Sequence, residues 1–128
     1  MPYELIVQTD FGAAHSLRQY KGKCERLHGH NWTIDVYFTA NELNEDGMII
    51  DFIEAKAAIR EAIKNYDHYH LNEVPPFDRI NPTSENIARV LAEGIQAQLP
   101  PRVRIVRVTA WESEGCGATY TPETRETP

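Results

Sequence analysis

The stretch His30-Asn-Trp-Thr-Ile-Asp-Val-Tyr-Phe-Thr-Ala40 decides the fold of this chain. Its even-numbered positions from Trp32 onward are all apolar, and its odd-numbered positions are mostly polar. Such alternation is typical of a strand with one face on a hydrophobic core. Residues 3–15 alternate in the same way, with most odd positions apolar, and predict a first strand. The polar and basic segment 16–27 between the two strands is interpreted as a loop.

Two helices are predicted to follow, over 51–66 and over 83–99. The first starts with an aspartate that is a good N-cap, and its apolar stripe begins at Phe52. Thr83 or Ser84 can cap the second helix, and a pair of prolines ends it.

The second half of the chain completes the predicted sheet. Residues 103–112 are rich in β-branched side chains and predict a third strand, and 118–122 can form a short fourth one. Arg107 breaks the alternation, which indicates a bulge or mixed burial. The order ββααββ predicts an α+β fold, a four-stranded antiparallel sheet with both helices on one face. We expect one domain over 1–122 and a flexible tail over 123–128.

Composition excludes several classes of protein. The 128 residues include 13 basic and 19 acidic side chains, and the net charge of −6 argues against a nucleic-acid or anionic-membrane partner. No segment approaches the length of a membrane span. The N-terminus lacks a secretory signal pattern, and two cysteines without such a signal are interpreted as thiols. We therefore expect a cytoplasmic protein.

Three histidines fall on the apolar side of the first two strands. His15 shares the parity of the first strand's apolar positions, and His28 and His30 share that of the second if this strand extends back through Gly29. Any one of them alone is best interpreted as a core histidine. Three imidazoles that meet at one end of a sheet instead suit Zn²⁺ and leave a fourth position open, as in catalytic sites.

Four further residues carry candidate chemistry. Cys24 leaves two alternatives open: a fourth metal ligand that closes the site, or a reactive thiolate beside the metal and basic residues. Asp67-His68 is a candidate proton-transfer pair. Glu112 lies on an apolar parity near its strand end, either as an exposed charge or held for a cation or ligand.

Six motifs occur in order along the chain. They are Phe11-Gly-Ala-Ala-His15, Cys24-x-x-x-His28-Gly-His30-Asn31, Met48-x-x-Asp51-Phe52, Asp67-His68-x-x-Leu71-Asn72, Pro82-Thr83-Ser84-Glu85-Asn86 and Glu112. Together they resemble the 6-pyruvoyl-tetrahydropterin synthase superfamily, over about residues 3–120. The short gap between Cys24 and His28 is similar to the 6-carboxy-5,6,7,8-tetrahydropterin synthase branch, because pyruvoyl-forming enzymes usually have a longer gap.

The resemblance implies a role for each candidate residue. It implies zinc ligands His15, His28 and His30, catalytic residues Cys24, Asp67 and His68, and substrate-binding residues Glu112, Thr83 and Ser84. In this reading Cys24 is the base, Asp67 and His68 form a proton relay shared with another protomer, and Glu112 anchors the pterin. Glu114 can share that anchoring role.

The resemblance also implies an assembly and a reaction. The tunnelling fold joins the sheets of ββααββ protomers into a barrel, a homo-oligomer (tetramer or hexamer) with pterin sites at protomer interfaces. The implied reaction converts 7,8-dihydroneopterin triphosphate to 6-carboxy-5,6,7,8-tetrahydropterin, with release of acetaldehyde and triphosphate, on the route to queuosine. The alternatives are a pyruvoyl-forming or folate-pathway relative with the same substrate, and a non-catalytic zinc module.

Overall fold

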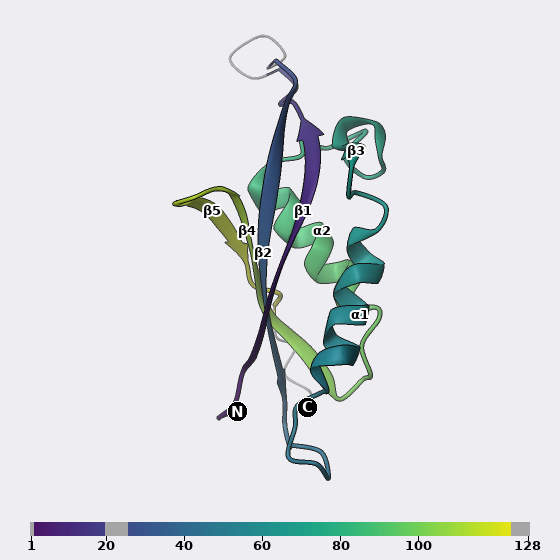
Figure 1. The fold of residues 1–128 in the computed structure, drawn as a ribbon, viewed down its shortest axis with the longest axis vertical. Helices are drawn as coiled ribbons and strands as arrows, with labels where there is room; N and C mark the ends of the chain where they lie inside the picture. Colours follow the sequence, from purple (N-terminus) through teal and green to yellow (C-terminus); the bar gives the residue numbers. More distant parts are fainter. Residues whose placement is uncertain (1, 20–25, 124–128) are drawn as a thin grey trace.

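Two long antiparallel strands run through the centre of the molecule (Figure 1). The computed structural model describes residues 2–19 and 26–123. Within it, β1 (Leu5–His15) pairs with β2 (His28–Ala40) along the whole length of β1. The even-numbered side chains of β2 from Trp32 to Phe38 are completely buried, which confirms the alternation.

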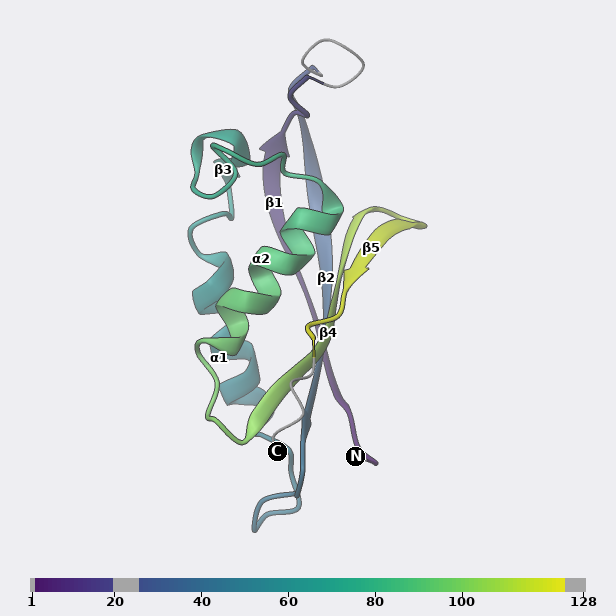
Figure 2. The same cartoon turned by 180° about the vertical axis from the view of Figure 1, so that it is seen from behind.

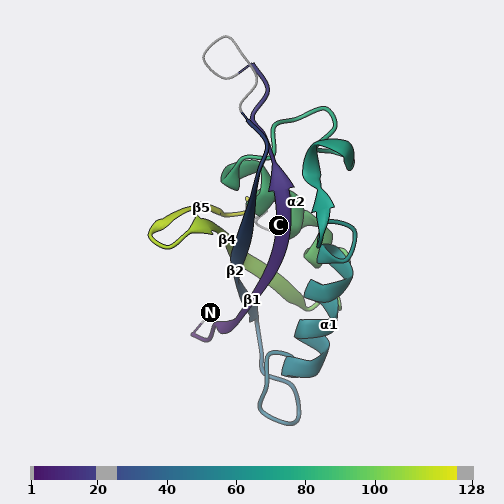
Figure 3. The ribbon, with the colours of Figure 1, turned by 45° about the horizontal axis from the view of Figure 1, so that its top comes forward.

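Both helices cover the same face of the sheet, as predicted (Figure 1 and Figure 2). The first, α1 (Phe52–Ile63), packs beside β1, and the second, α2 (Ser84–Gln96), packs across β4 (Val103–Ser113) and β5 (Cys116–Tyr120), as Figure 3 also shows. The core lies between the two helices and the apolar face of the sheet.

The sheet has five strands of mixed direction, so the prediction of four antiparallel strands was wrong. The strand order is β3-β1-β2-β4-β5, and the additional strand β3 (Tyr69–His70) runs parallel to the end of β1. A 3-10 turn, η1 (Leu71–Glu73), follows it directly. A strand of two residues is too short to show an alternating pattern in the sequence. Its formation depends on the position of the chain after α1, next to the end of β1.

The interruption predicted at Arg107 is a β-bulge. Tyr37 of β2 pairs with Arg107, whereas the next residue, Phe38, pairs with Ile105, so β4 carries one extra residue here. Because the bulge reverses the parity, Ile105 before it and Val108 after it both face the core.

Both predicted helix caps are present. The side chain of Asp51 accepts a hydrogen bond from the backbone N–H of Ile53, and that of Thr83 accepts one from Asn86. The apolar stripe of α1 differs from the prediction at its first residue, because Phe52 is 56% exposed. The buried residues of α1 begin instead at Ala55, one turn further along.

Two predictions fall wholly or mostly on parts of the chain outside the described residues. They are the position of Cys24 and the flexible tail over 123–128, of which only Glu123 is described. Within the described ranges, no helix is both long and apolar enough to cross a bilayer.

The cap of α2 gives a test of whether Thr83 is structural. Thr83→Ala should lower the free energy of unfolding by about 1 kcal/mol, because the N–H of Asn86 loses its acceptor. Thr83→Ser should restore most of that loss, and Ser84→Ala is the matched control outside the cap bond. Urea unfolding of the three variants measures the differences, and equal stability of Thr83→Ala and wild type would contradict the assignment.

Candidate active site

The register of β1 and β2 brings the three predicted histidines together. His15 lies directly opposite His28, and Ala13 lies opposite His30, at the end of the hairpin. The ring centroids are 4.7 Å apart for His15 and His28, 5.1 Å for His15 and His30, and 4.6 Å for His28 and His30. His15 is buried, whereas His28 and His30 are partly exposed, so the cluster is open on one side.

Main-chain carbonyls orient two of the three rings. Nδ1 of His15 lies 2.8 Å from the carbonyl oxygen of Pro82, and Nδ1 of His28 lies 2.8 Å from that of Arg26. A carbonyl only accepts, so each Nδ1 carries the proton and donates it. This tautomer leaves the lone pair on Nε2, which is the arrangement that outer partners impose on metal-binding histidines.

Glu112 joins the cluster from β4. Its Oε1 lies 2.8 Å from Nε2 of His30, 3.2 Å from that of His15 and 3.8 Å from that of His28. A second bulge on β4, between Trp111 and Ser113 in the pairing with β5, includes Glu112. Bulges re-aim side chains next to sites. The sequence placed Glu112 on an apolar parity, but it carried no signal that this carboxylate would meet the histidines.

The donor atoms fit a metal ion. The ligand atoms of His15, His28, His30 and Glu112 all lie within 4.8 Å of one another. In the described part of the chain, Nε2 of His15 is buried without a hydrogen-bond donor, although Oε1 of Glu112 lies 3.2 Å away. Because Nδ1 of His15 carries the proton, its Nε2 and the carboxylate oxygen are both acceptors, which suits a shared cation between them.

The charge state of His30 also favours a ligand role. Burial lowers the pKa of His30, the Glu112 carboxylate opposes this shift, and the neighbouring His15 and His28 rings reinforce it. The net effect keeps the His30 ring neutral at neutral pH. Neutral imidazole is the form that binds metal ions.

Asp67 and His68 lie at the edge of β1. The carboxylate of Asp67 accepts a hydrogen bond from the N–H of Gly12 at 3.1 Å, and the N–H of His68 donates to the carbonyl of Gly12 at 2.6 Å. Nε2 of His68 lies 3.6 Å from Asp67 Oδ1, and the His68 side chain is 87% exposed. The backbone of His68 has a left-handed φ of 66°. These contacts hold the pair together on β1, with the His68 ring directed to the outside.

The cluster of histidines and Glu112 does not include the remaining candidate residues Thr83 and Ser84, and Cys24 lies outside the described residues. Thr83 caps α2 and Ser84 is the first residue of that helix, so their observed contacts are those of a helix start. Arg18, a basic residue of the loop after β1 and not one of these candidates, donates its side-chain N–H groups to the carbonyls of Asn72, Phe77 and Ile80.

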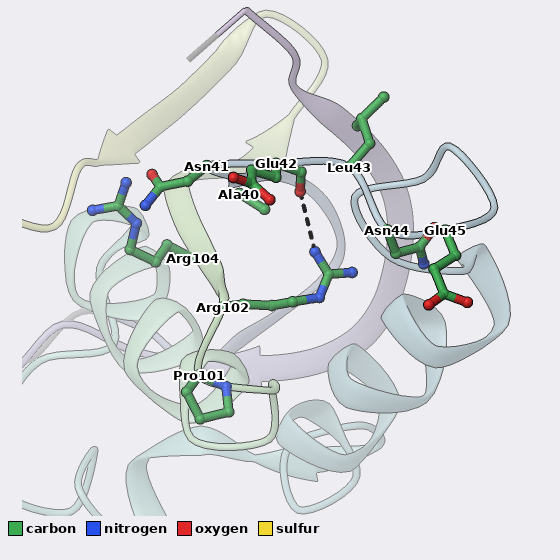
Figure 4. Close-up of a pocket in the computed structure, with 9 residues that line it drawn as sticks. All are labelled: Ala40, Asn41, Glu42, Leu43, Asn44, Glu45, Pro101, Arg102 and Arg104. Atoms are coloured by element: carbon green, nitrogen blue, oxygen red, sulfur yellow. Dashed lines mark hydrogen bonds between the residues drawn. The ribbon is translucent and has the colours of Figure 1, made fainter.

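A hollow of about 710 Å³ lies at the other end of β2, away from the histidines (Figure 4). Its lining consists of Ala40, Asn41, Glu42, Leu43, Asn44, Glu45, Pro101, Arg102 and Arg104. Arg102 reaches across it to donate to the carbonyls of Glu42 and Ile49, the first of which is the dashed line in Figure 4. Among the residues that the structure describes, no histidine or cysteine lines this hollow, and the candidate chemistry lies at the histidine cluster.

Comparison with known proteins agrees with this site. The family model for 6-pyruvoyl tetrahydropterin synthase matches residues 4–123. A 6-carboxy-5,6,7,8-tetrahydropterin synthase of Synechocystis sp. is 38% identical over 106 residues, which cover 79% of this chain and 81% of the relative. A dihydroneopterin monophosphate aldolase of Pyrococcus furiosus is 32% identical over 117 residues, which cover 91% of this chain and 96% of the relative.

A solved structure supports the same relationship. The 6-pyruvoyl tetrahydropterin synthase of Caenorhabditis elegans superposes with a TM-score of 0.84 at 26% identity, over 94% of this chain and 96% of that one. The matched residues include every described member of the histidine and carboxylate cluster. The chain therefore belongs to the 6-pyruvoyl tetrahydropterin synthase family and is an enzyme, a lyase of that family.

Proposed function

We propose that this enzyme binds zinc and converts 7,8-dihydroneopterin triphosphate and water to 6-carboxy-5,6,7,8-tetrahydropterin, acetaldehyde and triphosphate. The observation that carries the proposal is the convergence of His15, His28 and His30 on one point, in a member of a pterin enzyme family. We further propose that the enzyme is cytoplasmic and that its product enters the route to queuosine.

The proposed reaction requires side chains that accept and donate protons, and next to them a metal ion that withdraws electrons from the substrate. Zinc held by the three histidines would acidify a bound side-chain hydroxyl of the substrate. We assign Cys24 as the base that removes a proton from the adjacent carbon, and His68, supported by Asp67, as the group that handles the second proton. Elimination of triphosphate and cleavage of a carbon–carbon bond complete the reaction.

Glu112 and the helix start are the proposed substrate contacts. A carboxylate matches the two neighbouring N–H groups of the 2-aminopyrimidinone edge, so we propose that Glu112 anchors the pterin in the substrate complex. Glu114, two residues further on, can share that role. We also propose that Thr83 and Ser84 contact the substrate. In the structure Thr83 caps α2, and Ser84 is the first residue of that helix.

The spacing of Cys24 and His28 supports the carboxy-forming reaction over the pyruvoyl-forming one. A second candidate also has a specific observation behind it, since the Pyrococcus furiosus relative named dihydroneopterin monophosphate aldolase aligns with 91% of this chain. An aldolase would cleave a carbon–carbon bond of the side chain and leave a 6-hydroxymethyl group instead of a carboxylate. The two reactions therefore differ in their pterin product.

We also propose that the enzyme is a homo-oligomer, a tetramer or a hexamer, with its sites at protomer interfaces. Among the described residues, β3 pairs only with Ala13 and Ala14, so the rest of β1 has no partner on that side. Exposed apolar side chains gather around the start of β1 and the start of α1. They are Tyr3, Ile6, Met48, Phe52 and Ile53. The first four border a groove of about 450 Å³.

A position between protomers also suits the proton relay. His68 contacts the edge of β1 and is 87% exposed, whereas the three histidines contact one another, Trp32 and Glu112. A neighbouring protomer at that edge would bring its own site towards His68. We propose that each active site combines the histidines of one protomer with the relay of another.

The product assay is the direct test of the reaction. Purified zinc-loaded protein incubated with 7,8-dihydroneopterin triphosphate should yield acetaldehyde and 6-carboxy-5,6,7,8-tetrahydropterin in equal amounts. Coupled reduction of acetaldehyde and mass spectrometry of the pterin measure the two products. A parallel incubation uses the monophosphate. A 6-pyruvoyl product from the triphosphate, or a 6-hydroxymethyl pterin from the monophosphate, would instead assign the protein to one of the two alternatives.

Cys24→Ala separates a catalytic thiol from a metal ligand. The variant should keep its fold and bound zinc, yet lose turnover by about 10²-fold or more, because the base is gone. Cys116→Ala, which removes the exposed cysteine of β5, is the matched control and should retain turnover. Metal analysis with steady-state rates gives the readout, and loss of zinc in Cys24→Ala would favour Cys24 as a ligand.

The oligomer prediction is tested at the start of α1. Ile53 is apolar but 77% exposed in the monomer, so we expect a neighbouring protomer to cover it. Ile53→Glu would place a charge in that interface and should reduce the mass of the assembly. Ala57→Glu adds the same charge at an exposed position one turn further along the same helix, away from the residues that line the groove. Light scattering after size exclusion compares them, and equal masses for Ile53→Glu and wild type would exclude this patch from the interface.

A further inference from the structure

The position of Glu112 among the histidines goes beyond a role as a pterin anchor. Its Oε1 lies 2.8, 3.2 and 3.8 Å from the Nε2 atoms of His30, His15 and His28. Ligand bonds to zinc of about 2.0–2.2 Å in a tetrahedral arrangement separate neighbouring ligand atoms by roughly 3.3–3.6 Å. The three observed separations bracket that spacing.

The tautomer of His15 gives an independent indication. Its Nδ1 donates to the carbonyl of Pro82, so its Nε2 carries a lone pair, and this atom lies 3.2 Å from Oε1 of Glu112. Both atoms are then acceptors, and among the described residues Nε2 of His15 is buried without a donor. A cation between two neighbouring acceptors stabilises them, as in a shared metal site.

The backbone supports this placement of the carboxylate. Glu112 is the extra residue of the bulge that β4 forms in its pairing with β5. The pairing of β4 with β2 ends one residue earlier, at Trp111 opposite Thr33. Glu112 therefore lies just beyond the paired part of β4, on the same side of the strand as the buried Val108 and Ala110. A side chain in this position faces the histidines, while 36% of it stays accessible to solvent.

We propose that Glu112 is the fourth metal ligand in the substrate-free enzyme. The carboxylate closes the coordination sphere of the resting site, and the arriving substrate replaces it. Its release makes the same carboxylate available to the pterin, so one residue serves two states. This inference rests on metal binding by the proposed site and does not depend on which pterin product the enzyme forms.

Metal affinity without substrate tests the proposal. Metal-free wild type, Glu112→Gln, Glu112→Asp and Cys24→Ala are titrated with Zn²⁺ against a chromophoric chelator, with Glu114→Gln as the matched carboxylate control. Glu112→Gln should bind Zn²⁺ about tenfold more weakly or worse, because even residues outside the first coordination sphere are worth roughly 10–100-fold in affinity. Cys24→Ala and Glu114→Gln should bind as wild type does.

Glu112→Asp distinguishes ligation from simple charge attraction. It keeps the negative charge but shortens the side chain, so a true ligand loses reach and affinity falls as in Glu112→Gln. Full affinity in Glu112→Asp would overturn the proposal in favour of charge alone. Equal affinity of Glu112→Gln and wild type would also overturn it, and loss of affinity in Cys24→Ala alone would make Cys24 the fourth ligand.

A measurement on the unmodified protein removes any dependence on the folding of the variants. Wild type loaded with Co²⁺ is titrated with azide, and its visible absorption is followed. A sphere closed by Glu112 should leave the spectrum nearly unchanged, whereas Glu112→Gln should bind azide. Ready azide binding by wild type would show an open position and overturn the proposal. Neither readout uses substrate, so a failed product assay would leave this result intact.

Discussion

The structure depends on one constraint, the pairing register of β1 and β2. Side chains of a strand alternate between faces, so a slip of one residue would transfer every side chain of β1 to the other face. The observed register puts His15 opposite His28 and, by the same alternation, puts Phe11 and Trp32 in the core. The packing of the core and the assembly of the metal ligands are therefore consequences of the same pairing.

A second set of contacts ties the chain after α1 to the end of β1. The side-chain amide of Asn72 both accepts from the N–H of Ser16 and donates to its carbonyl, and that of Asn81 does the same with Arg18. Each such bond contributes about 1 kcal/mol net. Together they hold residues 71–82 against the strand end, where the carbonyl of Pro82 orients His15. The irregular segment thus selects the tautomer of a candidate metal ligand.

Much of the fold could be predicted because its signals are local. The alternation of residues 30–40 requires only neighbouring residues, and the caps at Asp51 and Thr83 act within one helical turn. The exposure of Phe52 could not be predicted from the same periodicity, since it depends on where the sheet ends beneath α1. The strand β3 is a similar case, because its two pairs with β1, Ala13 with Tyr69 and Ala14 with His70, join residues 56 positions apart in the chain.

The sequence by itself determined the two central strands, their buried faces and the side on which the three histidines lie, because strand periodicity is a property of adjacent residues. Only the tertiary structure decided that Glu112 meets those histidines and that Asp67 binds the backbone of Gly12. Glu112 and His30 are 82 residues apart in the chain, and the pairing of β2 with β4, together with a bulge, brings them to 2.8 Å. Long-range pairing of this kind leaves no periodic trace in a sequence, so the place of Glu112 among the candidate ligands followed from the fold.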